Sequence, residues 1–125
     1  MKVLVDSSVW IDFFRQGGDG TLDRLIDEYL VVTNDVILTE LLPSLKILNQ
    51  QEVIDSLLSF ERVPMQIDWT LIQYYQFINL QNGINKVGIP DLLILQQTIE
   101  SNLSLYTLDK HFKLMQNHFE FALLT

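Results

Sequence analysis

The chain contains no cysteine, so it can form neither a disulfide nor a cysteine-ligated zinc site. No stretch of it approaches the ~18 uninterrupted apolar residues of a membrane-spanning helix. The apolar run at the start is broken by Asp6, whereas a signal peptide needs an apolar stretch of about 7–15 residues. We therefore expect a cytoplasmic protein without membrane contacts that depends on a hydrophobic core for its stability.

Basic residues are also scarce, with 8 Lys and Arg against 16 Asp and Glu and a formal net charge of −8. A protein that only coats nucleic acid needs a basic surface, because the phosphates must be neutralised. The composition therefore disfavours a passive nucleic-acid binder. It does not disfavour an enzyme whose acidic residues hold metal cations, so the positions of the acids become the question.

Hydrophobic residues make up 48% of the 125 residues, which is enough for one substantial core. A chain of this length buries roughly two thirds of its unfolded surface on folding. No internal repeat, low-complexity segment or linker divides the sequence. We therefore expect a single domain over residues 1–125.

Short β-rich runs alternate with longer segments of helical periodicity. Strands are expected at 2–5, 30–33 and 103–107, with weaker candidates at 62–63 and 119–124. Pro43 should kink or divide the helix at 36–48, and Thr21 can cap the helix that follows it. The helices are expected at 9–15, 22–28, 36–48, 51–60, 69–81, 91–101 and 110–117. This alternation predicts an α/β fold, a three-layer α/β/α sandwich with a mostly parallel central sheet.

Four acids are expected on one rim of that sheet. Asp6 ends the first strand, and Asp109 lies two residues beyond a later one. Glu40 lies in the helix after the second strand, and Asp91 lies in the first turn of its own helix. Ligands of open α/β sheets bind beyond the carboxyl ends of the strands, so these four side chains should meet there.

Glu40 and Asp91 lie within apolar runs that contain no basic residue. A buried acid is unfavourable unless it is paired or binds a metal. Two carboxylates about 4 Å apart repel each other by roughly 4 kcal/mol at an effective dielectric constant of 20. Converging acids would therefore need a cation, and carboxylate oxygens suit Mg²⁺ or Mn²⁺.

Simpler explanations exist for each acid. Asp6, Asp91 and Asp109 could each only stabilise the start of a helix. Glu40 could lie on a solvated helix face, although it has no cap to make. The Ser7-Ser8 pair is not a nucleophile motif, because the G-x-S-x-G pattern is missing. A phospho-receiver domain is a weaker alternative, since residues 51–81 offer no Asp after a clear strand.

Four segments resemble the motifs of the PIN domain family, and in particular of VapC-type toxins. They are Val3-Leu4-Val5-Asp6-Ser7-Ser8-Val9-Trp10-Ile11-Asp12, Val36-Ile37-Leu38-Thr39-Glu40-Leu41, Ile89-Pro90-Asp91-Leu92-Leu93-Ile94 and Leu105-Tyr106-Thr107-Leu108-Asp109-Lys110-His111-Phe112. They occur in the family's order and cover essentially the whole chain. Each motif alone is unspecific, but together they are typical of the family.

The resemblance implies a Mg²⁺- or Mn²⁺-dependent endoribonuclease that cleaves single-stranded RNA and leaves a 5′ phosphate. Asp6, Asp91 and Asp109 would hold the metal, and Glu40 would bind it through water or act as a base. Ser7 and Thr107 would orient the carboxylates through their hydroxyl groups. The family also implies a toxin that forms a homodimer and binds a small antitoxin protein, and a catalytically inactive PIN-like binding module stays open.

The sequence departs from the family pattern in two respects. His111 stands where many relatives carry a further acid. Few basic residues are available to contact RNA phosphates: the candidates are Arg15, Lys46, Lys86, Lys110 and Lys113. For the antitoxin, we expect contacts at Trp10 and Phe13 of the first helix and at the loop Gly17–Gly20.

Overall fold

Five short strands form the centre of the protein in a computed structural model that describes residues 1–124. They are β1 (Val3–Val5), β2 (Val31–Thr33), β3 (Glu61–Arg62), β4 (Ser104–Tyr106) and β5 (Ala122–Leu123). The sheet has the order β3-β2-β1-β4-β5, and every pair in it is parallel. Strand order therefore reverses between β1 and β4, the kind of switch point where α/β folds bind ligands.

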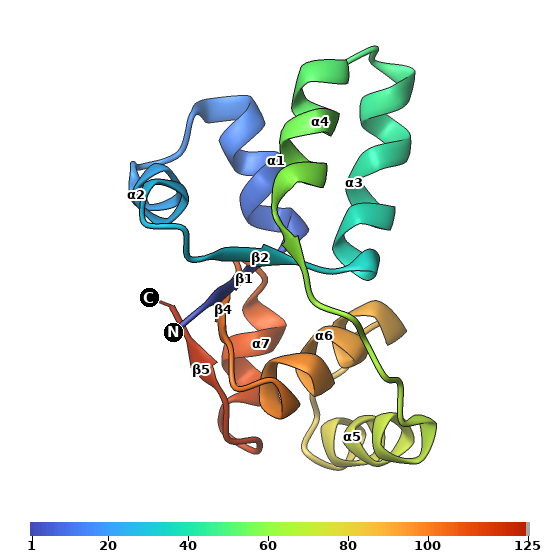
Figure 1. The fold of residues 1–125 in the computed structure, drawn as a ribbon. Helices are drawn as coiled ribbons and strands as arrows, with labels where there is room; N and C mark the ends of the chain where they lie inside the picture. The colour runs from blue at the N-terminus through green and yellow to red at the C-terminus, as the bar shows by residue number, and fades with distance from the viewer. Residues whose placement is uncertain (125) are drawn as a thin grey trace.

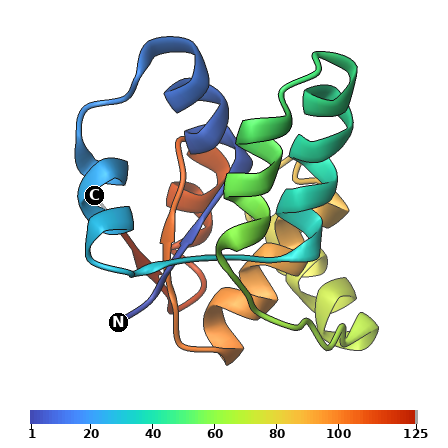
Figure 2. The same ribbon diagram turned by 45° about the horizontal axis from the view of Figure 1, so that its top comes forward.

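Helices cover both faces of the sheet (Figures 1 and 2). Figure 1 shows α1, α3 and α4 above the sheet and α5, α6 and α7 below it. Their bounds are α1 (Ser7–Gln16), α2 (Thr21–Asp27), α3 (Asp35–Ile47), α4 (Gln51–Ser59), α5 (Trp69–Gln81), α6 (Ile89–Glu100) and α7 (Lys110–Met115). The predicted three-layer α/β sandwich with a parallel sheet is confirmed.

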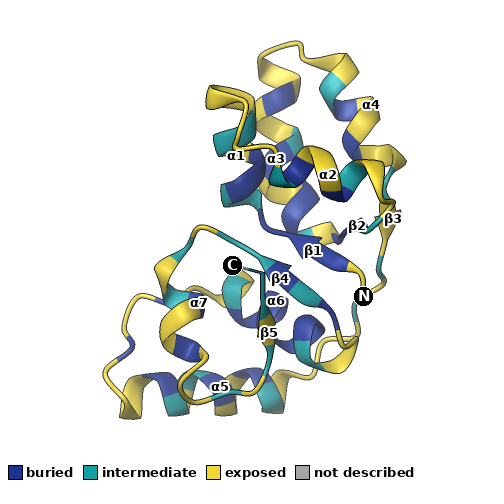
Figure 3. Cartoon of the chain, turned by 90° about the vertical axis from the view of Figure 1, so that its left-hand side faces the viewer, coloured by how far each residue is buried: buried dark blue, intermediate teal, exposed yellow. Residues whose placement is uncertain are grey.

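The core lies between the sheet and the two helical layers, where Figure 3 shows the buried residues gathered. The three residues of β1 are buried because strands cover both of its edges and helices cover both of its faces. Such a strand has no solvated side, which explains why its sequence is an uninterrupted apolar run. The strand ends as soon as a polar residue, Asp6, is reached.

Local details differ from the sequence-based expectations. Helix α1 begins at Ser7 and not at Val9, so it starts directly after Asp6. Gly20 is the residue before α2, and Thr21 is its first residue. Pro43 lies inside α3 but does not divide it. Pro43 is on the exposed side of that helix, where the carbonyl group that loses its hydrogen bond can be solvated.

No helix within residues 1–124 has the length and apolar character needed to cross a membrane.

Candidate metal centre

Asp6 is the most buried of the four acids, with 5% of its surface exposed. It stands at the N-cap of α1, but its carboxylate accepts no capping hydrogen bond from that helix. Instead, Thr107 Oγ1 donates to Asp6 Oδ2 at 2.7 Å, and Ser8 Oγ donates to the same oxygen at 2.9 Å. The simple capping explanation therefore fails for Asp6, whose side chain is held by two hydroxyl groups.

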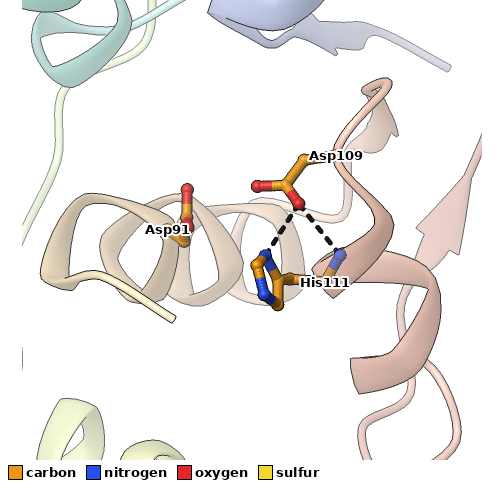
Figure 4. Close-up of side chains that lie close together, drawn as sticks. All are labelled: Asp91, Asp109 and His111. Atoms are coloured by element: carbon orange, nitrogen blue, oxygen red, sulfur yellow. Dashed lines mark hydrogen bonds and ion pairs between the residues drawn. The ribbon is translucent and has the colours of Figure 1, made fainter. Parts of the chain in front are cut away.

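Asp109 is the N-cap residue of α7 and makes further contacts besides the cap. Its Oδ1 accepts a hydrogen bond from the backbone N–H of His111 at 2.9 Å, so it caps the helix as expected. The Nδ1 atom of the His111 ring lies 2.9 Å from the same oxygen (Figure 4). The backbone N–H of Asp109 donates to Thr107 Oγ1 at 3.0 Å. Thr107 therefore links Asp109 to Asp6, since its hydroxyl contacts both residues.

Asp91 occupies the first turn of α6, after the N-cap residue Gly88. Burial is the main cause that raises the pKa of Asp91 from an ordinary value near 3.8 to about 6, and the negative charges of Asp109 and Asp6 add to it. A hydrogen bond from Gly88 and the nearby His111 act in the opposite direction. Asp91, Asp109 and His111 each offer a ligand atom within 4.8 Å of the others (Figure 4).

Glu40 lies in the middle of α3 and is exposed, yet it is not an ordinary surface acid. Partial burial of its carboxyl group raises its pKa, and the charges of Asp6 and Asp91 raise it further. Ser7 Oγ donates to Glu40 Oε1 at 3.4 Å and has the opposite effect. These charge interactions bring Glu40 into the same cluster as Asp6 and Asp91.

The four acids together have no basic partner within residues 1–124 apart from His111. Three of the eight Lys and Arg residues form ion pairs, and all three pair with other acids. The pairs are Lys2 with Glu61, Arg24 with Glu28, and Arg62 with Asp35. The cluster therefore carries negative charge that the protein itself does not balance.

These residues fit a divalent cation. Asp91, Asp109 and His111 offer ligand atoms to one place, and the charge of Asp6, directly after β1, acts on Asp91. Hard cations prefer carboxylate oxygens of this kind. Burial is the largest cause of the raised pKa values of Glu40 and Asp91, and repulsion from neighbouring acids, which a cation would relieve, adds to it. Asp91, Asp109 and His111 are close enough together to hold one ion, and Asp6 and Glu40 belong to the same charged cluster.

The predicted hydroxyl residues contact acids of the cluster directly, whereas the basic phosphate candidates line grooves or lie on the exposed surface. Thr107 contacts Asp6, while Ser7 contacts Glu40. Sequence reasoning missed Ser8, although its position two residues after Asp6 at a helix start favours a local contact. Among the phosphate candidates, Arg15 lines a groove that includes Glu40, and Lys110 and Lys113 line another that includes Asp109. Lys46 is exposed on α3, and Lys86 is exposed in the loop before α6.

The burial of Trp10 in α1 contradicts the expectation that this residue contacts an antitoxin. Trp10 is 3% exposed and packs against the rings of Phe13, Phe14 and Phe60, so it belongs to the core. It cannot contact another protein without local unfolding. Phe14, which is 38% exposed, is the aromatic residue of this helix that faces outward.

The PIN domain model matches residues 3–117. The comparison with curated proteins gives no match. PIN domains are generally nucleases, and they generally use divalent metal ions.

Several solved structures share the fold over nearly their full length. VapBC2 from Rickettsia felis, bound to a fragment of its promoter DNA, has a TM-score of 0.78 at 20% identity, with 99% of this chain and 98% of that chain covered. DNA-bound VapBC from Salmonella typhimurium has a TM-score of 0.78 at 14% identity, with 99% and 97% covered. VapC20 from Mycobacterium tuberculosis, a toxin that cleaves the sarcin-ricin loop, has a TM-score of 0.59 at 16% identity, with 95% and 97% covered. The match to the family model, over most of the sequence, shows that the chain belongs to the PIN domain family.

Proposed function

We propose that the protein is a divalent-metal-dependent endoribonuclease that cleaves single-stranded RNA, and that it is the toxin of a cytoplasmic toxin–antitoxin pair. The observation that carries the proposal is the convergence of Asp6, Glu40, Asp91 and Asp109 at the switch point of a parallel sheet, with no ion pair to Lys or Arg among residues 1–124. Family membership and the fold shared with VapC toxins support the same conclusion.

Each residue of the site has a role that follows from its surroundings. Asp6, Asp91 and Asp109 hold the ion, with Thr107 and Ser8 fixing the orientation of Asp6. A bound Mg²⁺ or Mn²⁺ supplies the positive charge that neutralises a phosphate and makes a water molecule more acidic. Glu40 accepts a proton from the attacking water, because an acid with a raised pKa is a stronger base.

The unpaired basic residues supply the contacts to RNA. Arg15 lies in a groove that includes Glu40, and Lys110 lies in another groove that includes Asp109. A strand of RNA that crosses the site between them would have phosphates near both cations. Lys86 extends this path from the loop before α6. A small number of such contacts would give binding that weakens as salt concentration rises.

The test compares wild-type protein with Asp6→Asn and with Asp27→Asn, a matched change in an exposed acid of α2. Purified proteins are incubated with single-stranded RNA in Mg²⁺, in Mn²⁺ and in EDTA. We expect cleavage by wild type and Asp27→Asn in either metal, and none by Asp6→Asn or in EDTA. Wild-type protein that binds Mn²⁺ but cuts no RNA would instead indicate an inactive binding module.

A partner protein is supported by a groove next to the site. Apolar residues of α1, α3 and α4 line it together with Arg15 and Glu40: Ile11, Phe14, Leu41, Leu45, Leu48 and Val53. An apolar antitoxin segment in this groove would lie against the acidic cluster and could block it. We expect Phe14→Asp to abolish inhibition by the antitoxin without loss of RNA cleavage. Unchanged inhibition would place the antitoxin elsewhere.

The homodimer is supported by α5, which exposes large side chains in a soluble fold. Tyr74, Phe77 and Leu80 are each more than half exposed and follow one another at helical spacing. Exposed apolar patches commonly mark interfaces between proteins. We expect a dimer by light scattering and a monomer for Phe77→Glu; a monomeric wild type would contradict this part of the proposal.

A further inference from the structure

Two buried amide side chains join the helical layers on opposite sides of the sheet. Asn34 is fully buried and Gln97 is 3% exposed. Asn34 Nδ2 donates to Gln97 Oε1 at 2.6 Å, across 63 residues of sequence. Asn34 precedes α3, which covers one face of the sheet, and Gln97 belongs to α6, which covers the other (Figure 1).

Each of the two side chains is fixed at its other end as well. Asn34 Oδ1 accepts a hydrogen bond from the backbone N–H of Ile37 at 2.8 Å, so it is the N-cap of α3. Gln97 Nε2 donates to the carbonyl oxygens of Val63 and Pro64 at 3.1 and 3.3 Å. The pair therefore ties the first turn of α3 to α6 and to the segment after β3, and neither amide can rotate without losing a bond.

The same two helices carry two acids of the candidate metal centre. Glu40 lies in α3, six residues beyond Asn34, and Asp91 lies in α6, six residues before Gln97. Six residues correspond to about 9 Å along a helix axis. The two acids therefore lie on the two helices that the amide pair joins, and the charge of Asp91 raises the pKa of Glu40.

We propose that the Asn34–Gln97 pair is a positioning clamp that fixes the separation of Glu40 and Asp91, and so the size of the cation site between the helical layers. Without the clamp, the repulsion between the acids would push α3 and α6 apart at the rim of the sheet. The inference rests on the proposed metal-dependent function only for the identity of the ion.

The choice of amides in the core supports this role over a purely stabilising one. Burying polar groups is unfavourable, and apolar side chains of similar volume often stabilise a core at least as well. Hydrogen bonds add direction, which fixes how far two elements lie apart and how they are rotated. A pair of buried amides between two helices that both carry site acids is suited to that purpose.

The chain offers a matched control in the neighbouring residue. Gln96 has the same side chain, lies in the same helix and is equally buried, with 2% exposed. Its amide contacts Gln66, Asp68 and Glu100 and has no bond to α3. Gln97→Met and Gln96→Met remove hydrogen bonds from the core at adjacent positions, so both should lower stability, but only Gln97→Met releases the clamp.

The first measurement needs no metal. Because the chain has no cysteine, spin labels can be placed at Lys46→Cys in α3 and Ser101→Cys after α6, which are both exposed. We expect pulsed electron paramagnetic resonance to give a narrow distribution of distances between the two spin labels in wild type and in Gln96→Met. Gln97→Met should broaden it or shift it to longer distances. Equal distributions in all three proteins would overturn the clamp.

The second measurement is Mn²⁺ affinity by calorimetry, followed by cleavage of single-stranded RNA. We expect Gln97→Met to bind Mn²⁺ about 10-fold more weakly and to lose kcat at saturating Mn²⁺ without a change in KM. Gln96→Met should match wild type in both. An affinity lost equally in the two variants would reduce the pair to a structural role. Wild-type protein that binds no Mn²⁺ would contradict the proposed function, while the spin-label distances would still decide the clamp.

Discussion

The acids at the carboxyl rim of the sheet differ from the acids elsewhere in the protein. Helix α3 contains one of each kind: Asp35 pairs with Arg62 at 3.2 Å, while Glu40, five residues later, faces Asp6 and Asp91. Glu61 and Glu28 are also paired with basic residues. Acids elsewhere are paired or singly solvated, whereas the rim gathers several acids whose charges act on one another.

This difference shows what the net charge of −8 means for the molecule. Much of the acidic excess is solvated or paired, and it has little influence on the energy of the fold. Burial and the charges of neighbouring acids raise the pKa values of Glu40 and Asp91, so their ionised forms are unfavourable in the folded protein until a cation binds. At the rim, the arrangement of acids that would bind a cation therefore lowers the stability of the metal-free fold. The ion pairs on the surface do not have this effect.

The largest effect is expected from Asp91→Asn. Loss of a ligand should lower RNA cleavage at least about 100-fold, since even residues that only support metal ligands often contribute 10- to 100-fold. In metal-free buffer at pH 7.5 the same change should raise the free energy of unfolding, because it removes a repelled charge. Kinetics and urea denaturation in EDTA measure the two effects.

In metal-free buffer Asp91→Asn should be more stable than the wild-type protein, and divalent ions should reverse this order. Wild-type protein is expected to gain about 2.7 kcal/mol when Mn²⁺ is present at 100 times its Kd, whereas Asp91→Asn gains much less. An Asp91→Asn protein that is less stable than wild type in EDTA would show that the carboxylate is a structural group and that the comparison between the rim and the surface is wrong.

The next effect concerns Thr107, whose hydroxyl contacts both Asp6 and the backbone of Asp109. Thr107→Val keeps the side chain's shape but removes the hydrogen bonds, so we expect Mn²⁺ affinity to fall about 10-fold or more. Thr70→Val, an exposed change in α5, is the matched control. Equal affinities for the two variants would mean that Asp6 holds its orientation without Thr107.

A smaller effect is expected in the pH dependence of stability, which tests the raised pKa of Asp91. Asp91 has a pKa near 6 in the folded protein, above its ordinary value, so the folded state holds the proton more tightly than the unfolded state. The stability that this proton contributes is fully present below about pH 4 and is lost as the pH rises through 6. Glu40 acts in the same direction.

We therefore expect the unfolding free energy of the metal-free wild-type protein to decrease, relative to that of Asp91→Asn, between pH 4 and pH 7. Denaturation curves at four or five pH values are sufficient, and the difference between the two proteins cancels the contribution of the acids that do not interact with Asp91. A difference that grows in favour of wild type with pH would contradict the raised pKa.

The strands and the rim could be predicted because they depend on local patterns. An acid at the end of an apolar run, such as Asp6, marks both the end of a buried strand and the edge of the sheet where ligands bind. Pro90 fits the first turn of α6, although the helix begins at Ile89, two residues before the predicted start at 91. These signals lead to the place where the four acids meet, and the roles of the acids stay predictions.

Contacts between distant segments could not be predicted in this way. Asn34 reads only as a helix cap in the sequence, and nothing marks Gln97, 63 residues away, as its partner. The burial of Trp10 in α1 also depends on a distant segment, because Phe60, directly after α4, packs against it. Such pairs depend on how the two helical layers are placed, and the amide side chains involved are common in exposed positions.

The smallest effect should come from the surface pair of Lys2 and Glu61, which joins the start of the chain to β3. Both side chains are about half exposed, so solvent weakens their attraction, and Glu61→Gln should lower stability by about 0–1 kcal/mol with no change in RNA cleavage or Mn²⁺ affinity. High salt should remove even this difference, because exposed charges are screened. If Glu61→Gln instead changed Mn²⁺ affinity, the charge of a distant acid would reach the rim. The rim and the surface could then no longer be treated as separate electrostatic regions.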